Sequence, residues 1–86
     1  MSMKSMELTP HQKMIIDALA DDYENIGEIS SAFPASVSKK QIEDALWFLI
    51  KQGVVRCFCP EKTEMKPVLD PQPHQLSEYW FDLSGA

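Results

Sequence analysis

The first pattern in the chain is an apolar stripe at helical spacing that follows a clear helix start. The stripe consists of Met14, Ile15, Ala18 and Leu19. Thr9 fits the N-cap, Pro10 the first helical position, and Gln12 completes a T-x-x-Q capping box. Acidic residues crowd the far end, where the helix dipole disfavours negative charge. The pattern therefore predicts a helix that frays or stops near residue 22.

A second, shorter helix is predicted from the segment NIGEISSAFP. Asn25 is a suitable N-cap, and the apolar positions after it recur at helical spacing: Ile26, Ile29 and Phe33. Pro34 disfavours helical geometry at the residue before it, so the helix closes after about two turns. The segment PASVS is expected to form the turn that follows.

A third helix starts at Ser38, which forms a second capping box with Gln41. Its apolar positions cluster on one face and predict the buried stripe: Ile42, Ala45, Leu46, Leu49 and Gly53. Gly53 is also well placed to end this helix in a left-handed conformation.

Two strands are predicted in the second half of the chain. VVRCFC, residues 54–59, is rich in β-branched and aromatic residues, and Pro60 ends it. YWFDLS, residues 79–84, alternates apolar and polar faces and is expected to pair antiparallel with the first strand. Residues 60–77 hold four prolines and show no clear period, which predicts a long loop. The pattern thus predicts an α+β fold, with one domain over residues 8–84 after a flexible tail of residues 1–7.

The order of these elements resembles the winged helix-turn-helix superfamily, and so do several segments. IGEIS is similar to the start of the second helix in many helix-turn-helix proteins. SKKQIEDALWFLIKQGVV resembles their recognition helix and its exit, with the pattern apolar-x-x-A-L-x-x-L-x-x-x-G-apolar-apolar. FDLS resembles the aromatic-x-Leu-Ser/Thr end of the second wing strand. The resemblance covers residues 8–84 and implies three helices followed by a two-stranded antiparallel hairpin, the wing, with a long loop.

The resemblance also implies a function: DNA binding in transcription regulation, as a dimer, with the third helix in the major groove. The DNA contacts implied by this are Ser38, Lys39, Lys40 and Gln41 on the helix and Lys62 and Lys66 in the wing. Lys39 and Lys40 would meet phosphate or guanine, and Gln41 would read adenine.

Two departures from DNA-reading relatives favour an alternative. Glu43 and Asp44 place carboxylates on the surface that would meet DNA, where phosphate repels them unless they accept from a cytosine amino group. Helix positions that are usually polar hold Trp47, Phe48 and Ile50. The alternative is a winged helix module that binds proteins and has no DNA contact of its own.

The aromatics of the third helix leave two interpretations open. Trp47 and Phe48 lie on opposite sides of the buried stripe, so one core face cannot take both. Either other parts of the chain cover them, or they are exposed, as an interface for a second copy or a protein partner or, for Trp47, as a ring that stacks on a base. The candidate interface residues are Trp47, Phe48, Ile50 and Trp80.

The charge of the chain only partly distinguishes between DNA binding and protein binding. The formal net charge of −5 disfavours tight non-specific binding to nucleic acid, because phosphate neutralisation supplies most of that affinity. Residues 39–66 carry six basic and four acidic groups, for +2, whereas residues 1–38 and 67–86 carry −4 and −3. The middle segment is the only one suited to a polyanion.

The two cysteines do not suggest a disulfide or a metal site. On a strand, Cys57 and Cys59 point to the same face about 7 Å apart along it, which is poor disulfide geometry. A metal site needs more ligands than His11, His74 and scattered carboxylates offer. We therefore expect reduced thiols, no metal and no cofactor; metal binding or a redox function of the two cysteines is the alternative left open.

Catalysis and membrane insertion have little support in the sequence. The chain has three glycines, no glycine-rich phosphate loop and no paired-acid motif, so we expect no enzyme. No apolar run approaches the roughly 20 residues that span a bilayer. The N-terminus lacks a signal-peptide core, and a cytoplasmic protein without membrane contact is expected.

Overall fold

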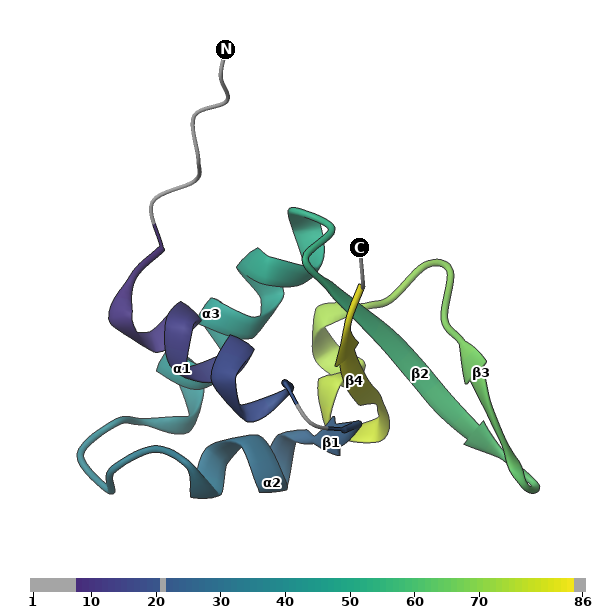
Figure 1. Cartoon of the computed structure of the whole chain (residues 1–86), viewed down its shortest axis with the longest axis horizontal. Coiled ribbons are helices and arrows are strands. Elements are labelled where there is room, and N and C mark those ends of the chain that lie inside the picture. The colour runs from purple at the N-terminus through teal and green to yellow at the C-terminus, as the bar shows by residue number, and fades with distance from the viewer. Residues whose placement is uncertain (1–7, 21, 85–86) are drawn as a thin grey trace, which may run out of the picture.

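The computed structural model describes residues 8–20 and 22–84. Within these residues the chain forms three α-helices, one 3-10 helix and four strands (Figure 1). In chain order they are α1 (Pro10–Ala18), β1 (Glu24–Asn25), α2 (Ile26–Ser31), α3 (Lys39–Lys51), β2 (Val55–Glu61), β3 (Glu64–Pro67), the 3-10 helix η1 (Pro73–Glu78) and β4 (Trp80–Leu83). The α+β class is as predicted, and the expected tail of residues 1–7 lies outside the described residues.

The three α-helices begin where the capping residues predict. Thr9, Asn25 and Ser38 are the N-caps, and each forms a complete capping box with the side chain three residues later. At its other end, α1 stops at Ala18 with Leu19 as C-cap, earlier than the predicted stop near residue 22. The early stop agrees with the cost of acidic residues at a helix C-terminus.

The sheet has four antiparallel strands in the order β1-β4-β2-β3. The predicted pair is present, because Val55 lies opposite Leu83 and Phe58 opposite Trp80. The prediction of a two-stranded sheet is wrong, since β1 and β3 add one strand on each side. Ser84 ties the end of β4 to the exit of α3, because its hydroxyl donates to the carbonyl oxygen of Gly53 at 2.6 Å.

The extra strand β3 arises because β2 runs on through Pro60 into a hairpin. Backbone groups on a strand alternate between its two sides, and the Val54 carbonyl accepts from Ser84 on the β4 side. The nitrogen of Pro60 points to that same side, beyond the end of β4, so its missing N–H removes no ladder bond. Lys62 opens the two-residue turn with a φ of 59°, a conformation usually taken by Gly or Asn.

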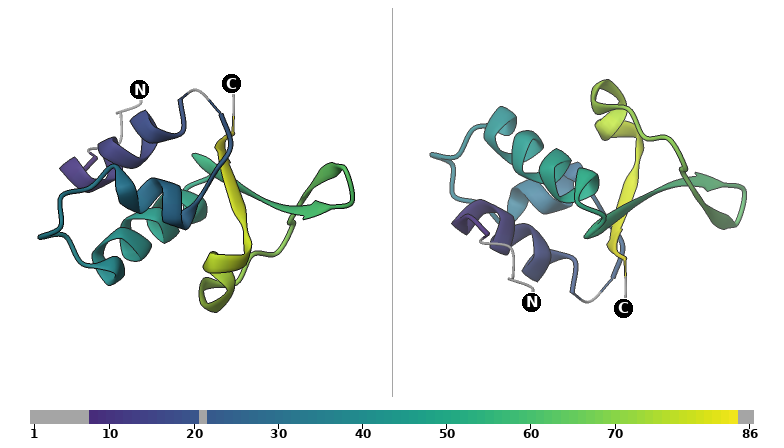
Figure 2. Two further views of the ribbon diagram at one scale, coloured as in Figure 1. Left: turned by 90° about the horizontal axis from the view of Figure 1, so that it is seen from below. Right: turned by 90° about the horizontal axis from the view of Figure 1, so that it is seen from above.

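The predicted irregular loop is therefore largely ordered. It holds β3, a short connection and η1, and Tyr79 is the C-cap of η1 just before β4. Figure 2 shows the β2–β3 hairpin projecting away from the helices in both views, while η1 lies close to the body of the molecule.

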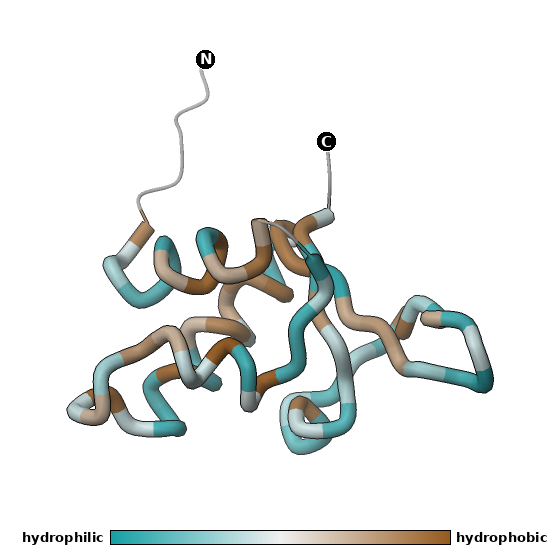
Figure 3. The backbone as a smooth tube through the Cα atoms, turned by 60° about the horizontal axis from the view of Figure 1, so that its bottom comes forward, coloured by the Kyte–Doolittle hydropathy of each residue, from teal (hydrophilic) through white to brown (hydrophobic). Residues whose placement is uncertain are grey.

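The hydrophobic core lies between the helices and one face of the sheet. Its buried side chains are Ile15, Leu19, Ile26, Ile29, Phe33, Ile42, Ala45, Leu46, Leu49, Val55, Cys57, Leu76, Tyr79 and Phe81. The predicted α3 stripe is buried except for Gly53, which is exposed and has a φ of 78°. Figure 3 shows hydrophobic and hydrophilic residues alternating along the helices, and a hydrophilic tip on the hairpin.

The other face of the sheet carries a small aromatic group of its own. Phe58 is buried there, with the ring of Tyr23 edge-on at 4.9 Å and the guanidinium of Arg56 5.1 Å from the ring centre. Trp80 lies directly opposite Phe58 and therefore shares this face.

Candidate functional site

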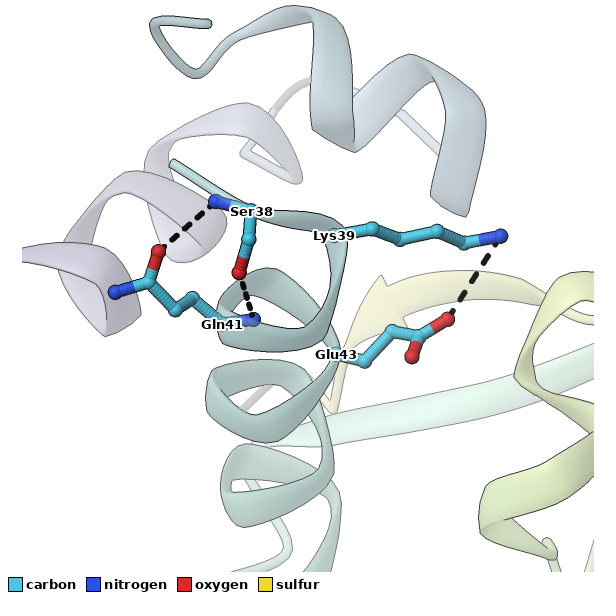
Figure 4. Close-up of polar contacts among 4 residues, drawn as sticks. All are labelled: Ser38, Lys39, Gln41 and Glu43. Atoms are coloured by element: carbon cyan, nitrogen blue, oxygen red, sulfur yellow. Dashed lines mark hydrogen bonds and ion pairs between the residues drawn. The ribbon is translucent and has the colours of Figure 1, made fainter. Parts of the chain in front are cut away.

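The start of α3 is held by its capping box. The Ser38 hydroxyl accepts from the Gln41 N–H at 3.1 Å, and the Gln41 side-chain oxygen accepts from the Ser38 N–H at 2.9 Å (Figure 4). Both side chains are exposed, and the amide nitrogen of Gln41 points away from the box. The side-chain oxygens thus fix the helix start, and the Gln41 amide nitrogen and the Ser38 O–H are donors left for a ligand.

The two lysines that follow are exposed and paired within the helix. Lys39 lies 4.0 Å from Glu43 (Figure 4). Lys40 lies 3.6 Å from Asp44, and in each pair the partners are one turn apart. The lysine side chains are 68% and 84% exposed, so water screens both pairs. Exposed i,i+4 pairs contribute about 0.3–0.5 kcal/mol, which a stronger anion can displace.

The hairpin brings the other two candidate lysines to a distant tip. Lys62 is in the turn, and Lys66 on β3 lies 3.5 Å from the Glu64 carboxylate. Glu61 closes the hairpin opposite Glu64, so the tip carries two bases and two acids. In Figure 1 the α2–α3 turn and this tip lie at opposite ends of the longest axis. The two lysine groups therefore do not form one patch.

Trp47 is half-buried on α3, beside η1. It packs against the core and borders a hollow of about 340 Å³ between the two helices. Glu43, Asp44 and His74 line the same hollow. The ammonium of Lys51 lies 5.9 Å from the centre of the Trp47 ring, within reach of a cation–π contact.

The four residues predicted as an interface do not share one surface. Phe48 on α3 is 36% exposed, whereas Ile50 is half-buried against the core. Trp80 is on the face of the sheet away from Cys57 and Phe81, which belong to the core. Any interface built on α3 therefore leaves Trp80 out.

The cysteines differ sharply in environment. Cys57 is buried in the core, and burial raises the pKa of its thiol to about 11. Cys59 is exposed near the hairpin. Among the described residues no group of three or more His, Cys, Asp or Glu side chains is placed to hold a metal ion. In that same part of the chain, no helix is both long and apolar enough to cross a membrane.

The sequence reasoning missed an apolar surface outside α3. Leu69, in the connection between β3 and η1, is 92% exposed and stands at the rim of an apolar hollow. The sequence feature that could have indicated it is the apolar pair Val68-Leu69 inside a proline-rich loop.

Comparison of the chain with protein-family models, curated proteins and solved structures finds no match.

Proposed function

We propose that this chain is a winged helix protein that binds duplex DNA in transcription regulation, with the start of α3 in the major groove and the β2–β3 tip on the backbone. The observation that carries the proposal is the position of α3 in the fold and the exposure of its first turn. Helix α3 follows α2 through a short turn and buries its apolar stripe, which leaves the polar residues 38–41 exposed at its first turn. That is the part of a recognition helix which contacts base edges.

The charge distribution supports this assignment. Helix α3 and the hairpin lie within residues 39–66, which carry a formal +2, while the rest of the chain carries −7. The acidic remainder lowers non-specific affinity, and four lysine–phosphate contacts would give a log–log salt slope of only about −3.6 per chain. Two chains on two half-sites would double this, which is why we include a dimer in the proposal.

The two carboxylates on α3 give the proposal of DNA binding a specific consequence that can be tested. Glu43 and Asp44 now neutralise Lys39 and Lys40. If DNA replaces them as partners of the lysines, they will oppose phosphate unless a cytosine amino group donates to them. Removing their charge should therefore strengthen binding to a random duplex.

The test is an NMR titration of the isotopically labelled chain with a short random-sequence duplex at low salt. We expect shifts in the amide signals of residues 38–44 and 60–67, and their loss on addition of salt. The double variant Lys39→Gln/Lys40→Gln should bind more weakly, with the salt slope reduced by about 2. The double variant Glu43→Gln/Asp44→Asn should bind more tightly, and Lys13→Gln, an exposed change on α1, should match the wild type.

If neither the wild type nor the Glu43→Gln/Asp44→Asn variant shows amide shifts with the duplex at low salt, DNA binding is rejected. That result would leave the second candidate, a winged helix that binds a protein. Two observations favour this candidate: Lys39, Lys40 and Lys66 are each paired with a carboxylate of the chain itself, and Phe48 on α3 is exposed. Charge neutralisation on α3 and an exposed aromatic suit a protein surface better than a polyanion.

A further inference from the structure

The capping box at the start of α3 fixes which way the Gln41 amide faces. Its side-chain oxygen accepts from the Ser38 N–H at 2.9 Å, and within a side-chain amide the oxygen is the atom that accepts. The amide nitrogen therefore points away from the box, on an exposed side chain (Figure 4). Gln41 thus presents two N–H donors to a ligand, while its oxygen is directed at the helix backbone.

The other side chains of this turn are donors as well. Lys39 and Lys40 are exposed, and an ammonium carries three N–H groups and no acceptor. The Ser38 oxygen already accepts a hydrogen bond within the capping box, at 3.1 Å, which leaves its O–H to donate outward. The first turn of α3 is therefore a surface of hydrogen-bond donors, and the acceptors Glu43 and Asp44 follow one turn later.

The two purines offer different partners to such a surface. In the major groove guanine presents two adjacent acceptors, N7 and O6, whereas adenine presents the acceptor N7 beside the N6 amino donor. A side-chain amide binds adenine through its oxygen and its nitrogen together. Because the capping box holds the Gln41 oxygen, the amino group of adenine would meet a donor, whereas both acceptors of guanine would meet one that suits them.

We propose that the start of α3 prefers G·C base pairs, with Gln41 and the two lysines before it donating to N7 and O6 of guanine. This inference rests on the proposed DNA binding and names the base that the same site reads. It replaces the adenine contact that the resemblance to helix-turn-helix proteins implies for Gln41. The carboxylates one turn later are compatible with it, because the cytosine paired with guanine has an amino group that can donate to them.

The test compares the binding of the full chain to short duplexes of equal length at low salt, followed by the anisotropy of a dye on the duplex. One duplex contains G·C pairs, the second contains A·T pairs, and the third is the G·C duplex with 7-deazaguanine, in which a C–H group replaces the N7 acceptor. We expect the G·C duplex to bind at least about fivefold more tightly than the A·T duplex, the lower end for one bidentate base contact. Replacement of guanine by 7-deazaguanine should remove most of this preference.

Gln41→Glu is the matched variant for the role of the amide. Glutamate at this position keeps the capping box and replaces the two N–H donors with an acceptor, so the preference for G·C over A·T should be lost. Lys13→Gln changes the net charge by the same amount on α1, away from the site, and should keep the preference. Thermal unfolding of both variants shows that they are folded.

Equal binding of the wild type to the G·C and A·T duplexes would overturn the guanine preference and leave DNA binding standing. A preference that survives 7-deazaguanine or Gln41→Glu would overturn it too, because such a preference would come from the shape of the duplex or from other side chains. If none of the duplexes binds, DNA binding itself is rejected, and the guanine preference with it.

Discussion

The hydroxyl of Tyr79 accepts a hydrogen bond from the backbone N–H of Gln72, seven residues earlier, at 3.1 Å. The same hydroxyl donates to the side-chain oxygen of Gln75 at 3.0 Å. The Tyr79 ring is buried and lies edge-on to Phe81, with the ring centres 6.4 Å apart. One buried phenol thus joins the N-cap and the first turn of η1 to the core.

We expect Tyr79→Phe to lower the free energy of unfolding by about 1–2 kcal/mol, because it leaves the Gln72 N–H and the Gln75 oxygen without this partner. Urea unfolding measures the loss, and hydrogen exchange at the Gln72 amide should be faster. Tyr23→Phe is the matched control. The Tyr23 ring packs on Phe58 and makes no side-chain hydrogen bond within the described residues, so little change is expected. Equal stability of the Tyr79→Phe variant and the wild type would contradict this account.

The two glycines within the described residues, Gly27 in α2 and Gly53 after the end of α3, should respond to alanine with opposite signs. Gly53 has a φ of 78°, and no atom lies within 4 Å of an added Cβ, so Gly53→Ala costs backbone strain of about 1 kcal/mol without a clash. In α2, a Cβ on Gly27 would meet the Asn25 side-chain oxygen at 3.4 Å, an ordinary contact. Gly27→Ala should therefore stabilise the fold by up to about 1 kcal/mol. Thermal unfolding of both variants checks the signs, and destabilisation by both would refute the strain argument.

The Cys57 thiol should make stability fall at high pH. Burial raises its pKa from 9.0 to about 11 in the folded protein. Below pH 9 the thiol is protonated in both states, whereas from pH 9 to about 11 the unfolded chain loses the proton first. The free energy of unfolding therefore declines across this window, as urea titrations at several pH values can measure. Cys57→Ala should remove this part of the decline, and Cys59→Ala should retain it.

A thiol reagent gives an independent check on the two cysteines. At neutral pH the native protein should react with one equivalent, at the exposed Cys59, and with a second only on unfolding. Fast reaction of both thiols in the native protein would show that Cys57 is accessible.

The helices were predictable because their signals are local. Each N-cap side chain accepts a hydrogen bond from a backbone N–H three residues later. The four-residue segments TPHQ and SKKQ are therefore enough to predict where α1 and α3 begin. Strand β1 has only two residues, and its pairing with β4 joins segments far apart in the chain. Strand β3 contains Lys66 and Pro67 and follows a turn without glycine, so its sequence does not favour a strand. Pairing with β2 is what makes it one.

The candidate site was predictable in part for the same reason. The sequence indicates the exposed Lys39 and Lys40 and also the carboxylates four residues later, whose pairing follows from helical spacing. The hollow beside Leu69 was not predictable. It exists only where the end of α3, β2 and the connection after β3 meet, and no local pattern encodes that meeting.

The arrangement of the strands also limits how copies of this chain can associate. One edge of the sheet is the two-residue β1, too short to template another strand. The other is β3, where the nitrogen of Pro67 faces outward without a hydrogen to donate. The same strand carries the charged Glu64 and Lys66. Neither edge supports fibre growth by strand addition. The sheet edges thus protect the chain against strand-to-strand association, even when the protein is concentrated.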